Sequence, residues 1–113
     1  MPIQVDGKTL ATDQEGFLLD PSEWNRGVAE FIAQGENLDL TADRWTVVEF
    51  VREYFEERQT VPEARTVLKM MGERLGKERG TRRALHDLFP YGYGQQACKI
   101  AGMRKPLKLM LDV

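Results

Sequence analysis

The apolar and polar residues follow a short period near the N-terminus of the chain. Residues 3–5 and 8–10 each contain apolar positions, and they flank the dipeptide Asp6-Gly7. Asp-Gly suits a two-residue hairpin turn, because both positions of that turn need positive φ. The pattern therefore predicts a short β-hairpin at the start of the chain.

From residue 20 onward the apolar residues recur every three or four positions, which is the period of helices with one buried face. Asp20, Thr41 and Thr81 can each cap the start of such a helix with a side-chain oxygen. The helices that we expect cover approximately 21–34, 42–58, 64–75, 82–89 and 94–101. The predicted fold is mainly α: a small helical bundle with an N-terminal β-hairpin in a domain over 1–106. The C-terminal arm over 107–113 could be mobile, or could form an extra strand or helical turn.

The composition limits the class of protein. A chain of 113 residues, 42% of them hydrophobic, suits one domain with one modest core. No apolar run reaches the about 20 residues of a membrane span, and the first residues lack the pattern of a signal peptide, so we expect a cytoplasmic protein. One cysteine and one histidine cannot build a zinc site, so we expect neither a metal nor a cofactor.

Charge is distributed unevenly along the chain. Residues 1–61 hold 5 Lys/Arg against 13 Asp/Glu, a net charge of −8, and residues 62–113 hold 11 against 5, a net charge of +6. A molecule with two charged halves can orient itself toward a charged partner. The arginines on two helices joined by a glycine-containing connector also suit phosphate binding in the manner of a helix-turn-helix. A plain solvated surface is the remaining interpretation.

Cys98 is the strongest candidate for a chemically reactive side chain in this sequence. A thiolate is the reactive form of cysteine, and Lys99, Arg104 and Lys105 are cations close to it in sequence that could lower its pKa. The alternative is a structural cysteine, because free cysteine is among the most buried residue types. The spacing alone leaves both interpretations open.

Several segments of the chain are similar to those of one known family. They include VDGK at 5–8, VREYF at 51–55, LGKERG at 75–80, LFPYG at 88–92 and QACKIAG at 96–102. On these segments, which cover nearly the full length, the chain resembles the DsrC/TusE family of sulfur-carrier proteins, related to the gamma subunit of dissimilatory sulfite reductase. The resemblance implies a small helical domain with an N-terminal hairpin and a flexible C-terminal arm, in agreement with the periodicity.

The resemblance also implies a chemistry that this chain cannot fully perform. In the family, a cysteine of the arm accepts sulfur, either as a persulfide in relays for tRNA 2-thiolation or together with an upstream cysteine in a trisulfide. The upstream cysteine corresponds to Cys98. The arm cysteine corresponds to Asp112 when counted from the chain end, or to Leu109 when counted from Cys98, and neither side chain can bear a persulfide.

We therefore predict a divergent member of this family that takes part in sulfur trafficking. Its expected partners are sulfur-transfer proteins, a sulfite-reductase-like complex or a tRNA-modifying enzyme. Cys98 is its only possible sulfur acceptor, and any enzymatic role extends at most to persulfide transfer through that thiol. The alternatives are a regulatory or nucleic-acid-binding protein on the same fold, and a scaffold whose apolar tail holds a partner or a second copy. The predicted binding residues are the cations Arg65, Lys69, Arg82, Arg83, Lys99, Arg104 and Lys105.

Overall fold

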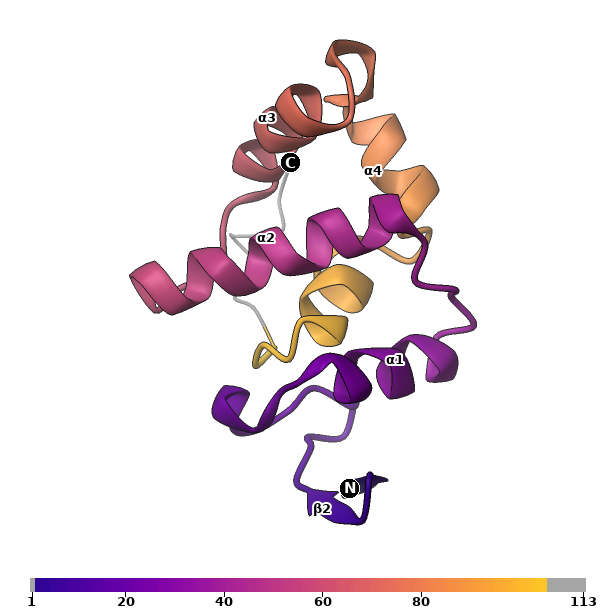
Figure 1. Ribbon diagram of the computed structural model, residues 1–113, viewed down its shortest axis with the longest axis vertical. Helices are drawn as coiled ribbons and strands as arrows, with labels where there is room; N and C mark the ends of the chain where they lie inside the picture. Colours follow the sequence, from indigo (N-terminus) through magenta and orange to yellow (C-terminus); the bar gives the residue numbers. More distant parts are fainter. Residues whose placement is uncertain (1, 106–113) are drawn as a thin grey trace.

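The protein is mainly helical, as predicted, with a two-stranded sheet at one end of the helical body (Figure 1). The computed structural model describes residues 2–105, so the predicted arm over 107–113 lies outside the described residues. The elements in chain order are β1 (Ile3–Val5), β2 (Lys8–Leu10), η1 (Pro21–Glu23), α1 (Arg26–Gly35), α2 (Ala42–Arg58), α3 (Ala64–Arg74), η2 (Lys77–Arg79), α4 (Arg82–Leu88) and η3 (Tyr93–Cys98).

The N-terminal hairpin confirms the sequence prediction. β1 and β2 pair antiparallel with Ile3 opposite Leu10. The turn residues Asp6 and Gly7 have φ of 52° and 79°, the left-handed conformation that a two-residue turn demands. The hairpin contacts α1, and Val5 and Leu10 are buried in the common core.

The helix predicted over 21–34 is interrupted, which differs from the prediction. Two capping side chains follow each other closely: the Asp20 carboxylate accepts from the backbone N–H of Ser22, and the Asn25 side chain accepts from that of Val28. Each begins its own helix, so η1 ends and α1 starts after an extended residue, Trp24. This break allows the indole of Trp24 to reach the C-terminal part of the chain.

The next three helices form close to where the sequence places them. Thr41 caps α2 and Thr81 caps α4 through their hydroxyl oxygens, and Gln59 ends α2 in the left-handed conformation. The buried residues of α2 are Val47, Val48, Val51 and Arg52. Among the described residues, no helix combines the length and the apolar character that crossing a membrane requires.

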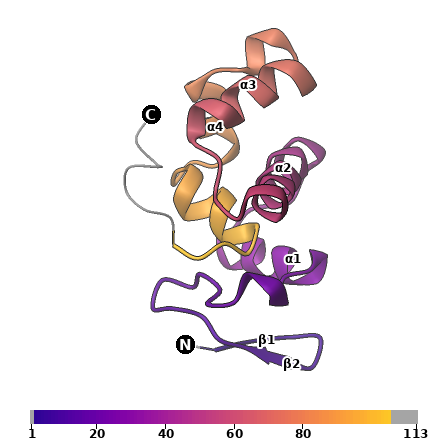
Figure 2. The same cartoon turned by 90° about the vertical axis from the view of Figure 1, so that its left-hand side faces the viewer.

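The last helical segment forms the centre of the bundle. It begins as a π-helical turn, η3, and continues helically to Ile100, whereas the sequence predicts an ordinary helix over 94–101. Figure 1 shows it between α1 and α2, and Figure 2 shows it beside both helices. All residues from 96 to 103 are buried, and the most exposed of them, Lys99, is 8% exposed.

Because it is buried, the end of this segment needs hydrogen-bond partners from within the protein. The final carbonyls of a helix lack partners in their own helix, and a buried carbonyl without one costs free energy. The Trp24 Nε1–H donates to the Ile100 oxygen at 2.7 Å, and the Arg52 Nη1 donates to the Ala101 oxygen at 3.3 Å. Two residues distant in sequence thus cap the central helix.

Gly102 allows this arrangement, and its replacement provides the first prediction. Gly102 has φ of +79°, and a Cβ on it would lie 2.4 Å from Cδ1 of Trp24. Gly102→Ala should therefore lower the free energy of unfolding by about 3 kcal/mol, from the strained backbone and the overlap with the indole. Chemical denaturation monitored by circular dichroism measures this change.

The matched control is Gly35→Ala, because a Cβ at Gly35 meets nothing within 4 Å. That variant should stay within about 0.5 kcal/mol of the wild type. Equal stability of the two variants would contradict the tight packing of Gly102 against Trp24.

Candidate functional site

Cys98 lies inside the protein, at the end of η3. Its side chain is a free thiol with 0% of its surface exposed. Burial disfavours the charged thiolate and raises the pKa of Cys98 to about 12, although a hydrogen bond with Tyr93 acts in the opposite direction. The folded protein therefore keeps this thiol protonated and out of reach of solvent.

Tyr93 is the polar neighbour of that thiol. Its hydroxyl donates to the carbonyl oxygen of Pro62 at 2.7 Å, and its side chain also forms a hydrogen bond with Cys98. Burial raises the pKa of Tyr93 well above its ordinary value. The tyrosine thus links the central helix to the segment before α3 and stays neutral.

The cations that follow Cys98 in sequence are paired with other groups. Lys99 Nζ bonds the Glu36 carboxylate at 3.0 Å, and both side chains are largely buried. Lys105 Nζ bonds Glu15 at 2.5 Å. Lys99 was predicted to lie on a binding surface, but the structure holds it in an internal ion pair because the central helix is buried.

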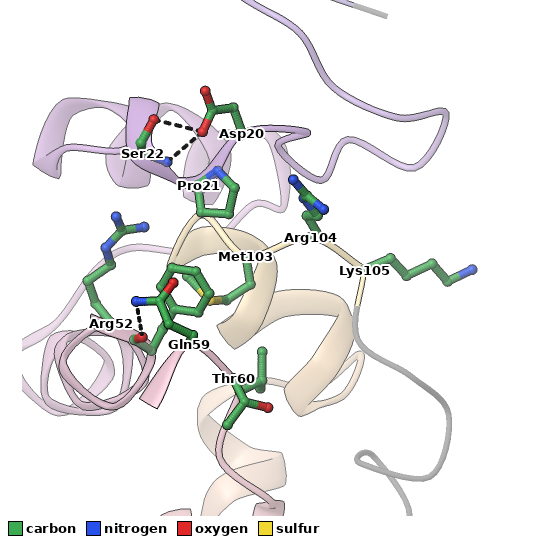
Figure 3. A pocket seen from close by; sticks show the side chains of 11 residues that line it. Asp20, Pro21, Ser22, Arg52, Gln59, Thr60, Met103, Arg104 and Lys105 are labelled. Atoms are coloured by element: carbon green, nitrogen blue, oxygen red, sulfur yellow. Dashed lines mark hydrogen bonds between the residues drawn. The ribbon is translucent and has the colours of Figure 1, made fainter. Parts of the chain in front are cut away.

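A cavity of about 670 Å³ lies where the described chain leaves the bundle (Figure 3). Figure 3 shows Met103 at its centre, with Arg52 and Gln59 to one side and the predicted binding residues Arg104 and Lys105 to the other. Arg104 Nε donates to the carbonyl of Leu19 at 2.9 Å. The remaining lining residues are Asp20, Pro21, Ser22, Phe55, Thr60 and Val61.

Arg52 is the residue of this cavity that sequence reasoning missed. It is only 9% exposed, its guanidinium lies 4.9 Å from the centre of the Trp24 ring, and its Nε bonds Glu56 at 3.2 Å. The signal that could have found it is its position in α2, since it lies four residues after Val48 on the apolar stripe. An arginine at a core position must find partners there, and the end of the central helix provides one.

A second cavity of about 390 Å³ lies beside α4. Two of the predicted binding residues, Arg82 and Arg83, line it, together with His86, which was not among the predicted binding residues. The other lining residues are Ala64, Leu85, Gly92 and Tyr93.

The predicted binding residues do not all line one cavity. Arg104 and Lys105 line the first cavity, and Arg82 and Arg83 line the second. Arg65 and Lys69 are exposed on α3 outside both, with Arg65 bonded to Glu63 at 3.0 Å. Within residues 2–105, no three or more His, Cys, Asp or Glu side chains come together in a way that could hold a metal ion.

Comparison with known proteins gives a consistent result over nearly the whole chain. Residues 4–110 match the family model described as DsrC like protein. The chain is 45% identical over 103 residues to the sulfurtransferase TusE of Salmonella choleraesuis strain SC-B67, covering 91% of this chain and 94% of that protein.

Two solved structures have the same fold. The oxidized gamma subunit of the dissimilatory sulfite reductase (DsrC) of Archaeoglobus fulgidus superposes with a TM-score of 0.88 at 31% identity. DsrC of Allochromatium vinosum superposes with a TM-score of 0.84 at 46% identity. Each match covers 95% of this chain and 97% of the other. The sequence and the fold therefore agree that this chain belongs to the family of DsrC-like proteins.

Proposed function

We propose that this protein takes part in sulfur trafficking by docking sulfur-transfer partners, and that it does not carry sulfur itself while it is folded. The observation that carries the proposal is the burial of Cys98, the only cysteine in the sequence. Persulfide formation needs an accessible thiolate. Burial raises the pKa of Cys98 to about 12, so the folded thiol stays protonated near neutral pH as well as enclosed.

The relatives support the choice of partners. They are named as sulfurtransferases or as the gamma subunit of a sulfite reductase, and they share the fold of this chain. A chain that keeps such a fold and lacks the arm cysteine can retain a docking surface without the carrier chemistry. Sulfur-transfer proteins, a sulfite-reductase-like complex and a tRNA-modifying enzyme are the partner classes that fit.

The proposal also includes a location and the surface used. A cytoplasmic location fits a protein whose single thiol is free. Exposed cations, including Arg104 and Lys105 at the first cavity and Arg82 and Arg83 at the second, are the side chains available to a partner. Lys99 is left out because Glu36 holds it inside the protein.

A mass measurement tests whether the folded protein carries sulfur. After treatment with inorganic polysulfide, the folded wild type should gain no sulfur in intact-mass spectrometry, because its thiol is enclosed. Leu109→Cys should gain about 32 Da, the mass of one sulfur atom. A gain of sulfur by the folded wild type that Cys98→Ala abolishes would refute the proposal. Wild type unfolded in urea is the control, because its exposed Cys98 should accept sulfur.

A competition experiment tests whether the protein docks. Sulfurtransferases of the host cell are purified singly, loaded with persulfide and offered the Leu109→Cys variant as acceptor. Wild-type protein in tenfold excess should slow the appearance of the sulfur adduct about tenfold, because it occupies the same site without accepting sulfur. An unchanged rate with every donor would argue against docking, and heat-denatured wild type is the control for nonspecific effects.

The buried thiol also predicts a dependence of stability on pH. The unfolded thiol, with an ordinary pKa near 9.0, loses its proton earlier than the folded one at about 12, so stability falls as pH rises through this window. From about pH 9 to 10 the wild type should lose about 1 kcal/mol more free energy of unfolding than Cys98→Ala. Parallel profiles of the two proteins in urea denaturation would show that Cys98 is not buried as described.

A further inference from the structure

The cavity beside α4 combines an apolar floor with a basic rim. Ala64, Leu85 and Tyr93 lie at its base and are 1%, 6% and 7% exposed. Arg82, Arg83 and His86 line it as well, and all three are exposed residues of α4. No carboxylate is among its lining residues.

The two arginines of this cavity have no ionic partner in the part of the chain that the structure describes. Some arginines do have one: Arg26 bonds Glu49, and Arg79 bonds Asp43 at 2.7 Å. Among residues 2–105, Arg82 and Arg83 form no ion pair, as is also true of the exposed Arg58 and Arg74 outside the cavity. Their charge is therefore available to a ligand of opposite sign.

The two arginines lie at a helix end where cations are unfavourable. Arg82 and Arg83 are the first two residues of α4, where the helix dipole is positive. Cations there are disfavoured by a few tenths of a kcal/mol up to about 1 kcal/mol, and acidic residues would be favoured. Helix stability therefore does not explain the choice of arginine at these positions.

The apolar residues at the base of the cavity indicate which kind of anionic partner would fit. Nucleic acids bind through tracks of cations and through aromatic rings on which bases can stack. The Tyr93 ring is buried and its hydroxyl is bonded to Pro62, so it offers no stacking face, and the rim holds three basic residues rather than a track. A cavity of about 390 Å³ with an apolar base suits an apolar side chain flanked by carboxylates.

We propose that the cavity beside α4 receives an acidic segment of a sulfur-transfer partner, with one apolar side chain on the floor of Ala64, Leu85 and Tyr93 and its carboxylates against Arg82, Arg83 and His86. This inference rests on the proposed docking function and gives it a place and a partner chemistry. The segment would lie over Tyr93, the residue that is hydrogen-bonded to Cys98, so docking would leave the thiol enclosed.

The test uses a probe of defined chemistry and a matched pair of variants. The probe is a fluorescein-labelled peptide, Glu-Asp-Leu-Asp-Glu, with a version in which Ser replaces Leu. Arg82→Glu/Arg83→Glu removes the basic rim and suits the dipole of α4, so the variant should fold. The control, Lys8→Glu/Arg58→Glu, reverses two exposed cations outside the cavity and has the same net charge.

Fluorescence anisotropy should show binding of the leucine peptide to the wild type and the control. Binding should weaken about tenfold or more in Arg82→Glu/Arg83→Glu, and for the serine peptide. Equal loss in both double variants would reduce the effect to net charge and overturn the inference. Binding of tRNA in place of the peptide, lost in the same variant, would also overturn it, because the occupant would then be a nucleic acid.

The competition assay separates this inference from the proposed function. If the wild type slows sulfur transfer and Arg82→Glu/Arg83→Glu does so equally well, the protein docks through another surface and only the inference fails. If the wild type does not slow transfer, the proposed function fails, whatever the peptide shows. If Arg82→Glu/Arg83→Glu no longer slows transfer while Lys8→Glu/Arg58→Glu still does, the result supports both the proposed function and the inference about the cavity.

Discussion

The structure depends on which side chains donate hydrogen bonds to the last carbonyl oxygens of the buried central helix. The segment from Gln96 to Met103 is buried, with Lys99 the most exposed residue at 8%, so its last carbonyls must find donors inside the protein. Trp24 and Arg52 provide them, from a loop and from the middle of α2. Gly102 then lets the chain turn against the Trp24 ring. These contacts fix the positions of η1, α2 and the central helix relative to one another.

The same enclosure determines what Cys98 can do. A thiol in a close-packed core contributes to packing as a small apolar side chain. Its ionisation would place a charge where water cannot reach it, which costs free energy. The protein has no second thiol to which the chemistry could move, because Leu109 and Asp112 stand where the family resemblance places the arm cysteine. The packing of Cys98 is therefore the reason for proposing a docking role rather than sulfur carriage.

Local signals in the sequence were sufficient for most of the fold. The Asp6-Gly7 turn and the caps Thr41 and Thr81 act through their immediate neighbours, so the hairpin, α2 and α4 form where they are predicted. The break at Trp24 follows from a local cap, Asn25, that the sequence prediction did not use, and no local signal indicated the π-helical turn of η3. The contact that the break permits was not predictable locally, because the indole of Trp24 bonds Ile100, 76 residues away.

The candidate sites were less predictable than the fold, for the same reason. Sequence shows where the charges are, but not which of them are neutralised by residues distant in the chain. Lys99 is removed from the surface by Glu36, which lies 63 residues away, and Arg79 is neutralised by Asp43.

Several exposed cations keep no ionic partner among the described residues, and Arg82 and Arg83 are the two of them that line the cavity beside α4. The cavity places this pair of charges next to an apolar floor. It thus gives part of a diffuse charge asymmetry a local shape. A partner recognises such a surface by its residual charge and its shape together, and the net charge of either half of the chain has no such geometry.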